Sequence, residues 1–381
     1  MRGILRDGKF VYATAVLVGT MVGVGIFGIP FAFAKAGFWV GTAWLVGLAL
    51  IVILFDLVFA ELVLSSPGTH QVVGYINIWL GPLGRALMTC ALLISMYGAL
   101  LAYMIVSGEF LHNVLSQFLA VNPQWYSIGF ASMLSLMWFI RLRTMAVFEI
   151  VLVGLYASII AVIAGIGFPH IQWDHITAWT PEYWHLPYGV LLFAFAGMSA
   201  IPLQRELLSG RERLMRPAII TAVSIVAVLY LIFAFTIVGI SGDITSPESF
   251  AGLFGTFGMP VIILGSCLGL LTMTTSYILL GTALFETFHR DYRIRPIHAW
   301  MLTLVPPLLM FVSGLRNFID VIGLVGAVAI GFQSVLVLIA YVRSRKNRLR
   351  TPEFNIPIPS LLVWCLALIF LAGVVFELML R

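Results

Sequence analysis

The chain has 381 residues, of which 61% are hydrophobic and 10% charged, and its mean hydropathy is +1.06. Soluble domains are about half apolar and about a quarter charged, so this composition excludes a soluble globular protein. Roughly 20 apolar residues cross a bilayer, and the sequence predicts a single membrane domain over residues 1–381. The net charge of +5 predicts no nucleic-acid partner, because the basic residues follow the membrane topology.

Apolar runs between polar breaks predict eleven membrane-spanning helices. Their ranges are 10–35, 40–64, 84–110, 123–140, 146–168, 187–206, 215–240, 255–287, 297–313, 319–342 and 358–379. Of the 21 Lys and Arg residues, all but Lys35, Arg316 and Arg381 fall in loops on the side of the N-terminus. The positive-inside rule therefore predicts a multi-pass protein of the cell membrane, with a cytoplasmic N-terminus and an external C-terminus.

Several classes of function have no support in the sequence. The three cysteines, Cys90, Cys267 and Cys365, lie within predicted spans at spacings that fit neither a zinc site nor a disulfide framework. No histidine falls at the middle of a predicted span, so we expect no metal centre. Neither a P-loop nor a nucleophile elbow is present. The sequence therefore predicts no cofactor and no enzyme activity.

The first and sixth predicted spans carry the same interruption. Gly25–Pro30 reads Gly-Ile-Phe-Gly-Ile-Pro and Gly197–Pro202 reads Gly-Met-Ser-Ala-Ile-Pro, an offset of 172 residues. The same offset relates Gly154 to Gly326. Partners are five spans apart, so the second copy crosses the membrane in the opposite sense. We expect an inverted repeat of five plus five spans, with copies at 10–168 and 187–342 and an additional span at 358–379.

Matching interruptions of this kind predict broken helices. Proline lacks an N–H group, and glycine tolerates unwound backbone. Unpaired backbone groups are too costly in lipid, so such a segment has to line a cavity or be buried in protein. Discontinuous helices at corresponding positions of an inverted repeat are typical of transporters. The alternative for either segment alone is a glycine or proline that only packs or kinks its helix.

Four segments resemble one known family. They are Val18–Pro30 followed by Ala36-Gly-Phe38, Tyr97–Glu109, Phe193–Pro202 and Thr275–Gly281. Together they resemble the amino acid/auxin permease family of the amino acid-polyamine-organocation superfamily, most closely its bacterial aromatic and hydroxy amino acid permeases. The likeness covers most of the chain. It implies an all-α integral membrane protein with the leucine-transporter fold, in which spans 1 and 6 are discontinuous.

The resemblance also implies two sites. The substrate's carboxylate is expected at unwound span 1 and its ammonium at carbonyls of spans 1 and 6, with spans 3 and 8 completing the pocket. The matching substrate-binding residues are Thr20, Val22, Gly23, Gly25, Tyr97, Tyr103, Phe193, Ala196 and Gly197. Sodium-coupled members of the fold hold an ion between spans 1 and 8. The matching groups are the carbonyls of Gly19, Val22 and Thr272 and the hydroxyls of Thr275 and Ser276.

The coupling ion is left open between proton and sodium. The hydroxyls of Thr275 and Ser276 suit a cation, but in the alternative they bond carbonyls of the preceding turn. Asp56 lies deep in span 2, where a carboxylate is costly and marks a functional group. It is the candidate for a proton relay or gate. The permeases that this chain resembles are generally driven by protons.

Together these patterns predict a secondary active transporter, an ion-coupled symporter that imports neutral or aromatic amino acids by alternating access. Its expected partners are a small-molecule amino acid and the lipid bilayer. Two alternatives stay open. One is an amino-acid-sensing receptor of the same fold, similar to spore-germinant receptor subunits, and the other is a transporter of another small amine. The particular amino acid and the oligomeric state are left open.

Overall fold

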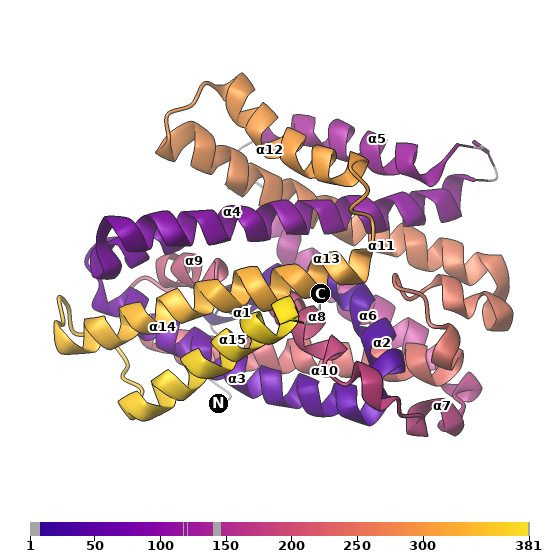
Figure 1. Cartoon of the computed structure of the whole chain (residues 1–381), viewed down its shortest axis with the longest axis horizontal. Helices are drawn as coiled ribbons and strands as arrows, with labels where there is room; N and C mark the ends of the chain where they lie inside the picture. Colours follow the sequence, from indigo (N-terminus) through magenta and orange to yellow (C-terminus); the bar gives the residue numbers. More distant parts are fainter. Residues whose placement is uncertain (1–7, 117, 120, 140–145, 380–381) are drawn as a thin grey trace.

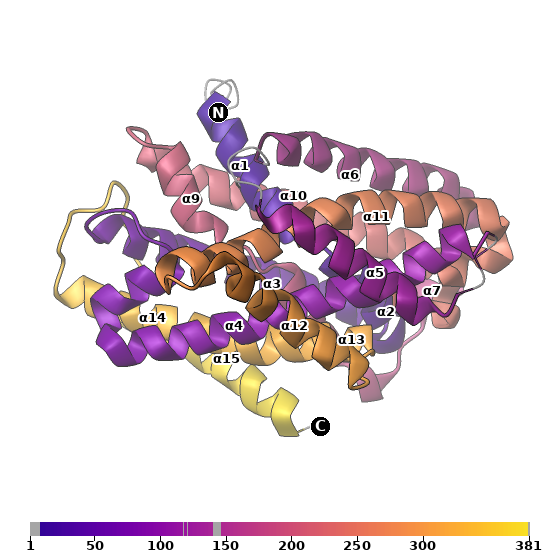
Figure 2. The same cartoon turned by 90° about the horizontal axis from the view of Figure 1, so that it is seen from above.

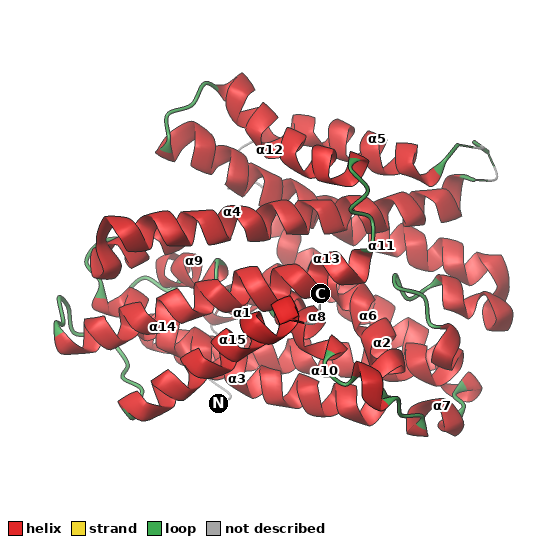
Figure 3. Ribbon diagram, viewed as in Figure 1, coloured by secondary structure: helices red, strands yellow, loops and turns green. Residues whose placement is uncertain are grey.

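The computed structural model describes residues 8–116, 118–119, 121–139 and 146–379, and within these residues every regular element is a helix (Figure 3). Most long helices run along one common direction, which is horizontal in Figure 1. Five of the basic residues counted for the topology lie outside the described residues: Arg2, Arg6, Arg141, Arg143 and Arg381.

Each predicted span coincides with one helix or with helices joined end to end. The α-helices are α1 (Gly8–Met21), α2 (Gly25–Ala36), α3 (Phe38–Ser65), α4 (Val72–Leu115), α5 (Pro123–Ser135), α6 (Ala146–Gly167), α7 (Trp173–Thr177), α8 (Leu186–Ala194), α9 (Ala200–Leu207), α10 (Met215–Ser241), α11 (Phe254–Glu286), α12 (Pro296–Val312), α13 (Phe318–Leu324), α14 (Gly331–Lys346) and α15 (Ser360–Met379). A π-helical segment, η9 (Val325–Ile330), joins α13 to α14.

Among the described residues, six helices are long and apolar enough to cross a bilayer alone, and the bent pair of α1 and α2 adds a seventh. At the other four predicted positions, α5, α12 and the pair α8 and α9 do not reach that length and hydropathy, and of the α6 region only Ile160–His170 qualifies, as a shorter apolar helix. The positions of the predicted spans are thus confirmed as helical, and the total of eleven crossings stays a prediction.

The third span of each predicted repeat is kinked in the same way. Helix α4 begins twelve residues before the predicted start at 84, because its first turns precede a kink at Gly81 with φ 72°. Helix α11 is kinked at Gly258 with φ 68°. Both positive φ values favour glycine, and Pro82 and Pro260 follow closely. The kink therefore recurs in the third span of each predicted repeat.

The broken helices lie in the middle of the bundle. Helix α10 packs against α1, α2, α3 and α6, while α8 packs against α2, α13 and η9. Helices α14 and α15 lie on one side of the molecule and α6 and α11 on the other (Figure 2). The approach of α8 to η9 is unusually close, because a Cβ atom built on Gly326 would lie 2.7 Å from the backbone nitrogen of Phe193. At its predicted repeat partner, Gly154, no atom of the described residues lies within 4 Å of such a Cβ.

We call the end of the bundle where α3 ends and α4 begins the basic face, and the other end the opposite face. Arg348 lies 3.7 Å from the buried carboxylate of Glu61 near the end of α3. The same carboxylate accepts hydrogen bonds from the hydroxyl of Tyr341 (2.8 Å) and the N–H of Ile356 (2.9 Å). These bonds connect α14 and the segment between α14 and α15 to α3.

Candidate functional site

The first predicted interruption is a break between α1 and α2. Helix α1 ends at Met21, α2 begins at Gly25, and their axes differ by 58°. Between them the N–H of Gly23 donates to the carbonyl of Met21 over 2.9 Å, which is not a helical bond. The first N–H groups of α2 have no acceptor inside the helix and carry the positive end of its dipole. This break therefore offers donors to an anionic group.

The second predicted interruption separates α8 from α9. Helix α8 ends at Ala194, and α9 begins at Ala200. The N–H of Phe195 still bonds the carbonyl of Leu191 (2.8 Å), so the helix closes with its carboxyl end in the break. The last carbonyls of a helix lack an intrahelical donor and carry the negative end of the dipole. This break therefore offers acceptors to a cationic group.

The two breaks lie against each other. A Cβ atom built on Gly25 would lie 2.9 Å from the Cα atom of Ala194, and one built on Gly197 would lie 2.5 Å from the Cε atom of Met21. A side chain at either glycine would need one of these neighbours to shift. Glycine thus permits the approach, and the N-terminus of α2 lies beside the carboxyl end of α8.

The predicted residues Tyr103 and Phe193 lie at this meeting point. A Cβ atom on Gly23 would collide with the hydroxyl of Tyr103, so this hydroxyl approaches the unwound backbone itself. The side chain of Tyr103 is 7% exposed. The ring of Phe193 comes within 3.1 Å of a Cβ atom on Gly25. Ala196 is half-buried within the second break.

The remaining substrate-binding candidates are placed differently. The hydroxyl of Tyr97 donates to the carbonyl of Leu302 on α12 over 2.7 Å, so the structure does not bring Tyr97 to the breaks. The hydroxyl of Thr20 bonds the carbonyl of Val16 within its own helix. Val22 is fully buried in the first break, so only its backbone is a candidate for contact with a ligand.

The hydroxyls proposed for an ion site bond their own helix. Thr275 donates to the carbonyl of Thr272 over 3.0 Å, and Ser276 donates to the same oxygen over 3.4 Å. The hydroxyl of Thr272 bonds the carbonyl of Gly269. This is the back-bonding that the sequence left as the alternative. Gly19 is buried in the last turn of α1, and the ion site stays a prediction.

Asp56 is enclosed within the bundle. Its side chain is 1% exposed, and its Oδ2 atom has no hydrogen-bond partner among the described residues. It lies nine residues before the end of α3 at Ser65, roughly 14 Å along the helix. Burying a carboxylate oxygen without a partner is costly. The role of Asp56 as a proton relay or gate stays a prediction.

The family of this chain follows from its similarity to known proteins. The sequence matches the tryptophan/tyrosine permease family over residues 6–380. The chain belongs to this family. It is also 24% identical over 368 residues to the tyrosine-specific transport system 1 of Haemophilus influenzae, and the match covers 90% of each protein.

Solved structures share the fold of this tryptophan/tyrosine permease family member. MhsT in complex with L-phenylalanine has a TM-score of 0.69 at 14% identity, and the match covers 98% of both chains. Mhp1, a nucleobase-cation-symport-1 family transporter in a closed conformation with bromovinylhydantoin bound, has a TM-score of 0.64 at 10% identity. That match covers 98% of this chain and 90% of Mhp1. The expected leucine-transporter fold is confirmed.

The resemblance to aromatic amino acid permeases is confirmed as well, while the wider assignment to the amino acid/auxin permease family stays a prediction. The family is one of permeases and the curated relative is a tyrosine-specific transport system, so this permease is an amino acid transporter embedded in a membrane and not an enzyme. The exact limits of the two repeats stay predictions.

Tyr230 of this permease is a site residue that no sequence motif indicated. Tyr230 is fully buried on α10, and its hydroxyl lies 2.9 Å from the carbonyl oxygen of Met21 and 2.8 Å from that of Ala194. It therefore touches both breaks. The available signal was its depth: Tyr230 lies fifteen residues into α10, roughly 22 Å from its start, whereas tyrosines that anchor a span lie at the membrane interfaces.

A cluster of phenylalanine rings near the first break was likewise not predicted from the sequence. The ring of Phe27 on α2 lies 5.1 Å from that of Phe110, 5.8 Å from that of Phe250 and 6.3 Å from that of Phe233. All four are buried. The hydroxyl of Ser249 bonds the carbonyl of Phe27 over 2.5 Å. We call these four rings the aromatic cluster; it is centred on Phe27 of α2, the half-helix on the opposite-face side of the first break.

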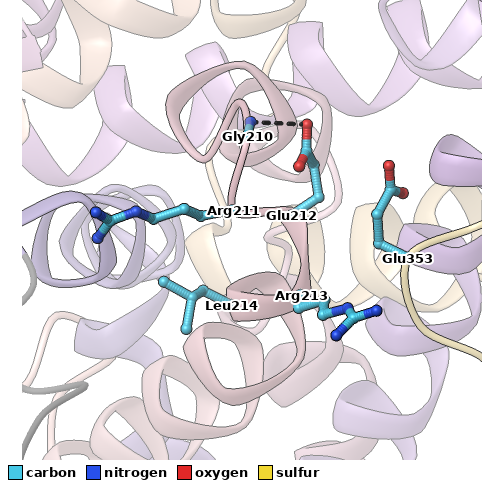
Figure 4. A pocket seen from close by; sticks show the side chains of 6 residues that line it. All are labelled: Gly210, Arg211, Glu212, Arg213, Leu214 and Glu353. Carbon is cyan, nitrogen blue, oxygen red and sulfur yellow. Dashed lines mark hydrogen bonds between the residues drawn. The ribbon is translucent and has the colours of Figure 1, made fainter.

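One surface hollow lies away from the breaks. It encloses about 370 Å³ at the basic face and is lined by Gly210, Arg211, Glu212, Arg213, Leu214 and Glu353 (Figure 4). The N–H of Gly210 donates to Glu212 over 3.0 Å. None of the predicted site residues lines it, so the hollow is distinct from the permease's candidate site.

Proposed function

We propose that the chain is an ion-coupled symporter that imports a neutral aromatic amino acid, which binds between the two breaks and crosses the membrane by alternating access. One observation carries this proposal: the N-terminus of α2 lies beside the carboxyl end of α8, next to the hydroxyl of Tyr103. An amino acid carries an anionic and a cationic group on one carbon atom. Anions are favoured at helix N-termini and cations at C-termini, so the pair of helix ends fits this class.

The carboxylate accepts hydrogen bonds from the N–H groups at the start of α2 and from Tyr103. The ammonium donates to carbonyls at the end of α8. The second break contributes small side chains, which leave room for an aromatic ring: Ala194, Ala196, Gly197, Ser199 and Ala200. Membership of the tryptophan/tyrosine permease family supports an aromatic substrate. Neither break contains a charged residue, which supports a neutral one.

A thermal-shift screen with matched ligands tests the substrate class. Tyrosine, tryptophan or phenylalanine should stabilise the purified protein, by about 2.7 kcal/mol at a hundredfold excess over Kd. Tyramine and tryptamine lack the carboxylate and should not stabilise it. Stabilisation by these amines alone would favour the amine-transporter alternative. Binding without uptake into proteoliposomes would favour the receptor alternative.

The variant Tyr103→Phe tests the binding pose. It removes one donor to the carboxylate and should raise the Kd about tenfold, since a hydrogen bond to a charged group contributes roughly 1.5 kcal/mol or more. Tyr188→Phe is the matched control, because Tyr188 is also 7% exposed and its hydroxyl has no hydrogen-bond partner among the described residues. Equal affinities for the two variants would contradict the pose.

We infer that the coupling ion is a proton carried by Asp56. The unpartnered Oδ2 atom of Asp56 and the back-bonded hydroxyls of Thr275 and Ser276 support this choice over sodium. In proteoliposomes, an inward proton gradient should drive accumulation. Asp56→Asn should abolish that accumulation while leaving exchange of labelled for unlabelled substrate intact. Accumulation driven by sodium at equal pH, and lost in Thr275→Ala with Ser276→Ala, would contradict this inference.

We also propose that the basic face is the cytoplasmic one, in keeping with the distribution of Lys and Arg. A reporter fused after Arg381 should then be active only outside the cell. A cytoplasmic readout at that fusion would contradict both this orientation and the odd number of spans.

A further inference from the structure

The two breaks share one hydrogen-bond donor on a third helix. The hydroxyl of Tyr230 lies within hydrogen-bond distance of the carbonyl oxygens of Met21 (2.9 Å) and Ala194 (2.8 Å). Met21 is the last residue of α1, and Ala194 is the last residue of α8. The ring of Tyr230 lies 5.4 Å from that of Phe195, and the whole side chain is buried. The hydroxyl is therefore held between the carboxyl ends of two half-helices.

Such a position would otherwise attract a cation. Both carbonyls belong to the groups that a helix leaves without an internal donor, and both carry the negative end of a helix dipole. The carbonyl of Met21 also accepts the N–H of Gly23, which lies outside the helix, and its second lone pair faces Tyr230. Two such oxygens that converge in a buried place form part of the oxygen ligand set that a small monovalent cation takes. A tyrosine hydroxyl has only one proton, so at any moment it donates fully to one of the two carbonyls.

We propose that Tyr230 is a positioning residue that ties the two breaks together, and that its hydroxyl stands where a cation would otherwise bridge α1 and α8. The consequence for transport rests on the proposed function, since it assumes that the substrate binds at the breaks. Helices α1 and α8 belong to different predicted repeats, and α10 packs against α1. Any movement that separates the two breaks has to take the hydroxyl out of reach of one of the two carbonyls.

The variant Tyr230→Phe tests this role, because it keeps the ring and removes the shared donor. The two carbonyls should then take up a cation. Without substrate, purified Y230F should melt several degrees higher in lithium or sodium chloride than in choline chloride at equal ionic strength, and this difference should be larger than in the wild type. In proteoliposomes its KM should rise about tenfold in choline, a loss of roughly 1.4 kcal/mol, and recover in lithium or sodium while the maximal rate changes less.

Two further proteins sharpen the test. Tyr188→Phe removes a buried hydroxyl that bonds none of the described residues, and it should show no added cation dependence. Replacement of Tyr230 by 4-aminophenylalanine restores a donor with two protons and should restore the wild-type salt response. If Y230F does not fold in choline, a higher yield of folded protein in lithium or sodium is the same supporting result.

A Y230F protein with the wild-type KM and the wild-type salt response would overturn the proposal. So would a loss of affinity that none of lithium, sodium or potassium relieves. The melting comparison needs no substrate. A wild-type protein that binds no aromatic amino acid would therefore sink the proposed function, while the melting data would still decide whether Tyr230 stands in for a cation.

Discussion

The half-helices on the two sides of the breaks are held by different kinds of contact. On the opposite face, α2 and α8 meet their neighbours backbone against backbone. A Cβ atom on Gly326 would lie 2.7 Å from the nitrogen of Phe193, and one on Gly25 would lie 2.9 Å from the Cα atom of Ala194. In the aromatic cluster, Phe27 of α2 packs against three further buried rings. This side is held by close apolar packing.

On the basic face, side-chain hydrogen bonds join α1, α9 and α3. Gln204 of α9 donates to the carbonyl of Ala13 in α1 over 2.9 Å. Lys9 donates to the carbonyl of Ser209 over 3.0 Å. Arg205 donates to a carbonyl at the end of α3 over 2.6 Å. The contacts on this side therefore depend on a few polar groups at the ends of long side chains.

The difference predicts which side opens more easily. Water replaces a lost hydrogen bond at small net cost, about 1 kcal/mol, whereas nothing in water replaces apolar packing. We expect the half on the basic face to open first and at lower free energy. The half on the opposite face should tolerate little change in volume. The following predictions test this contrast from the largest expected effect to the smallest.

Gly326→Ala should have the largest effect. The added methyl group would meet backbone atoms of α8 that cannot turn aside as a side chain can. Overpacking of this kind costs roughly 3 kcal/mol, so uptake should fall about a hundredfold and the melting temperature should drop. Gly154→Ala is the matched control at the predicted repeat position, where none of the described residues has an atom within 4 Å. Comparable losses in both variants, measured by uptake and thermal unfolding, would contradict the contrast.

Substitution of the two glycines at the breaks should show the same contrast between backbone and side-chain neighbours. In Gly25→Ala the methyl group would meet the Cα atom of Ala194, whereas in Gly197→Ala it would meet the ends of the Met21 and Leu17 side chains. Flexible side chains can move aside, so Gly25→Ala should lower substrate affinity about tenfold, or roughly 1.4 kcal/mol, and Gly197→Ala only a few-fold. A larger loss for Gly197→Ala in binding assays would reverse the ranking.

The positions of the two breaks could be predicted from the sequence, whereas the contacts of the tyrosines around them could not. The pattern Gly-x-x-small-Ile-Pro located both breaks, since local chemistry decides where a helix can unwind. Tyr230 could not be assigned in that way, because its role depends on which carbonyls α10 approaches after folding. The same limit applies to Tyr97 and Tyr103. Both lie on α4 with similar surroundings in sequence, and only packing directs Tyr97 to Leu302 and Tyr103 to Gly23.

Arg205→Ala should have the smallest effect and should reveal the movement itself. It removes the hydrogen bonds that Arg205 donates to two carbonyls at the end of α3 and to the hydroxyl of Tyr75. Hydrogen bonds to water replace these bonds in part. The free energy of the form that is open to the basic face should fall by roughly 1 kcal/mol relative to that of the closed form. A cysteine placed at Ala13, in a background without the three native cysteines, should then react several-fold faster with a reagent applied from that face. Arg213→Ala is the control, because it removes the same charge from the rim of the surface hollow. Equal labelling rates for the two variants would show that the bonds of Arg205 do not hold this half closed.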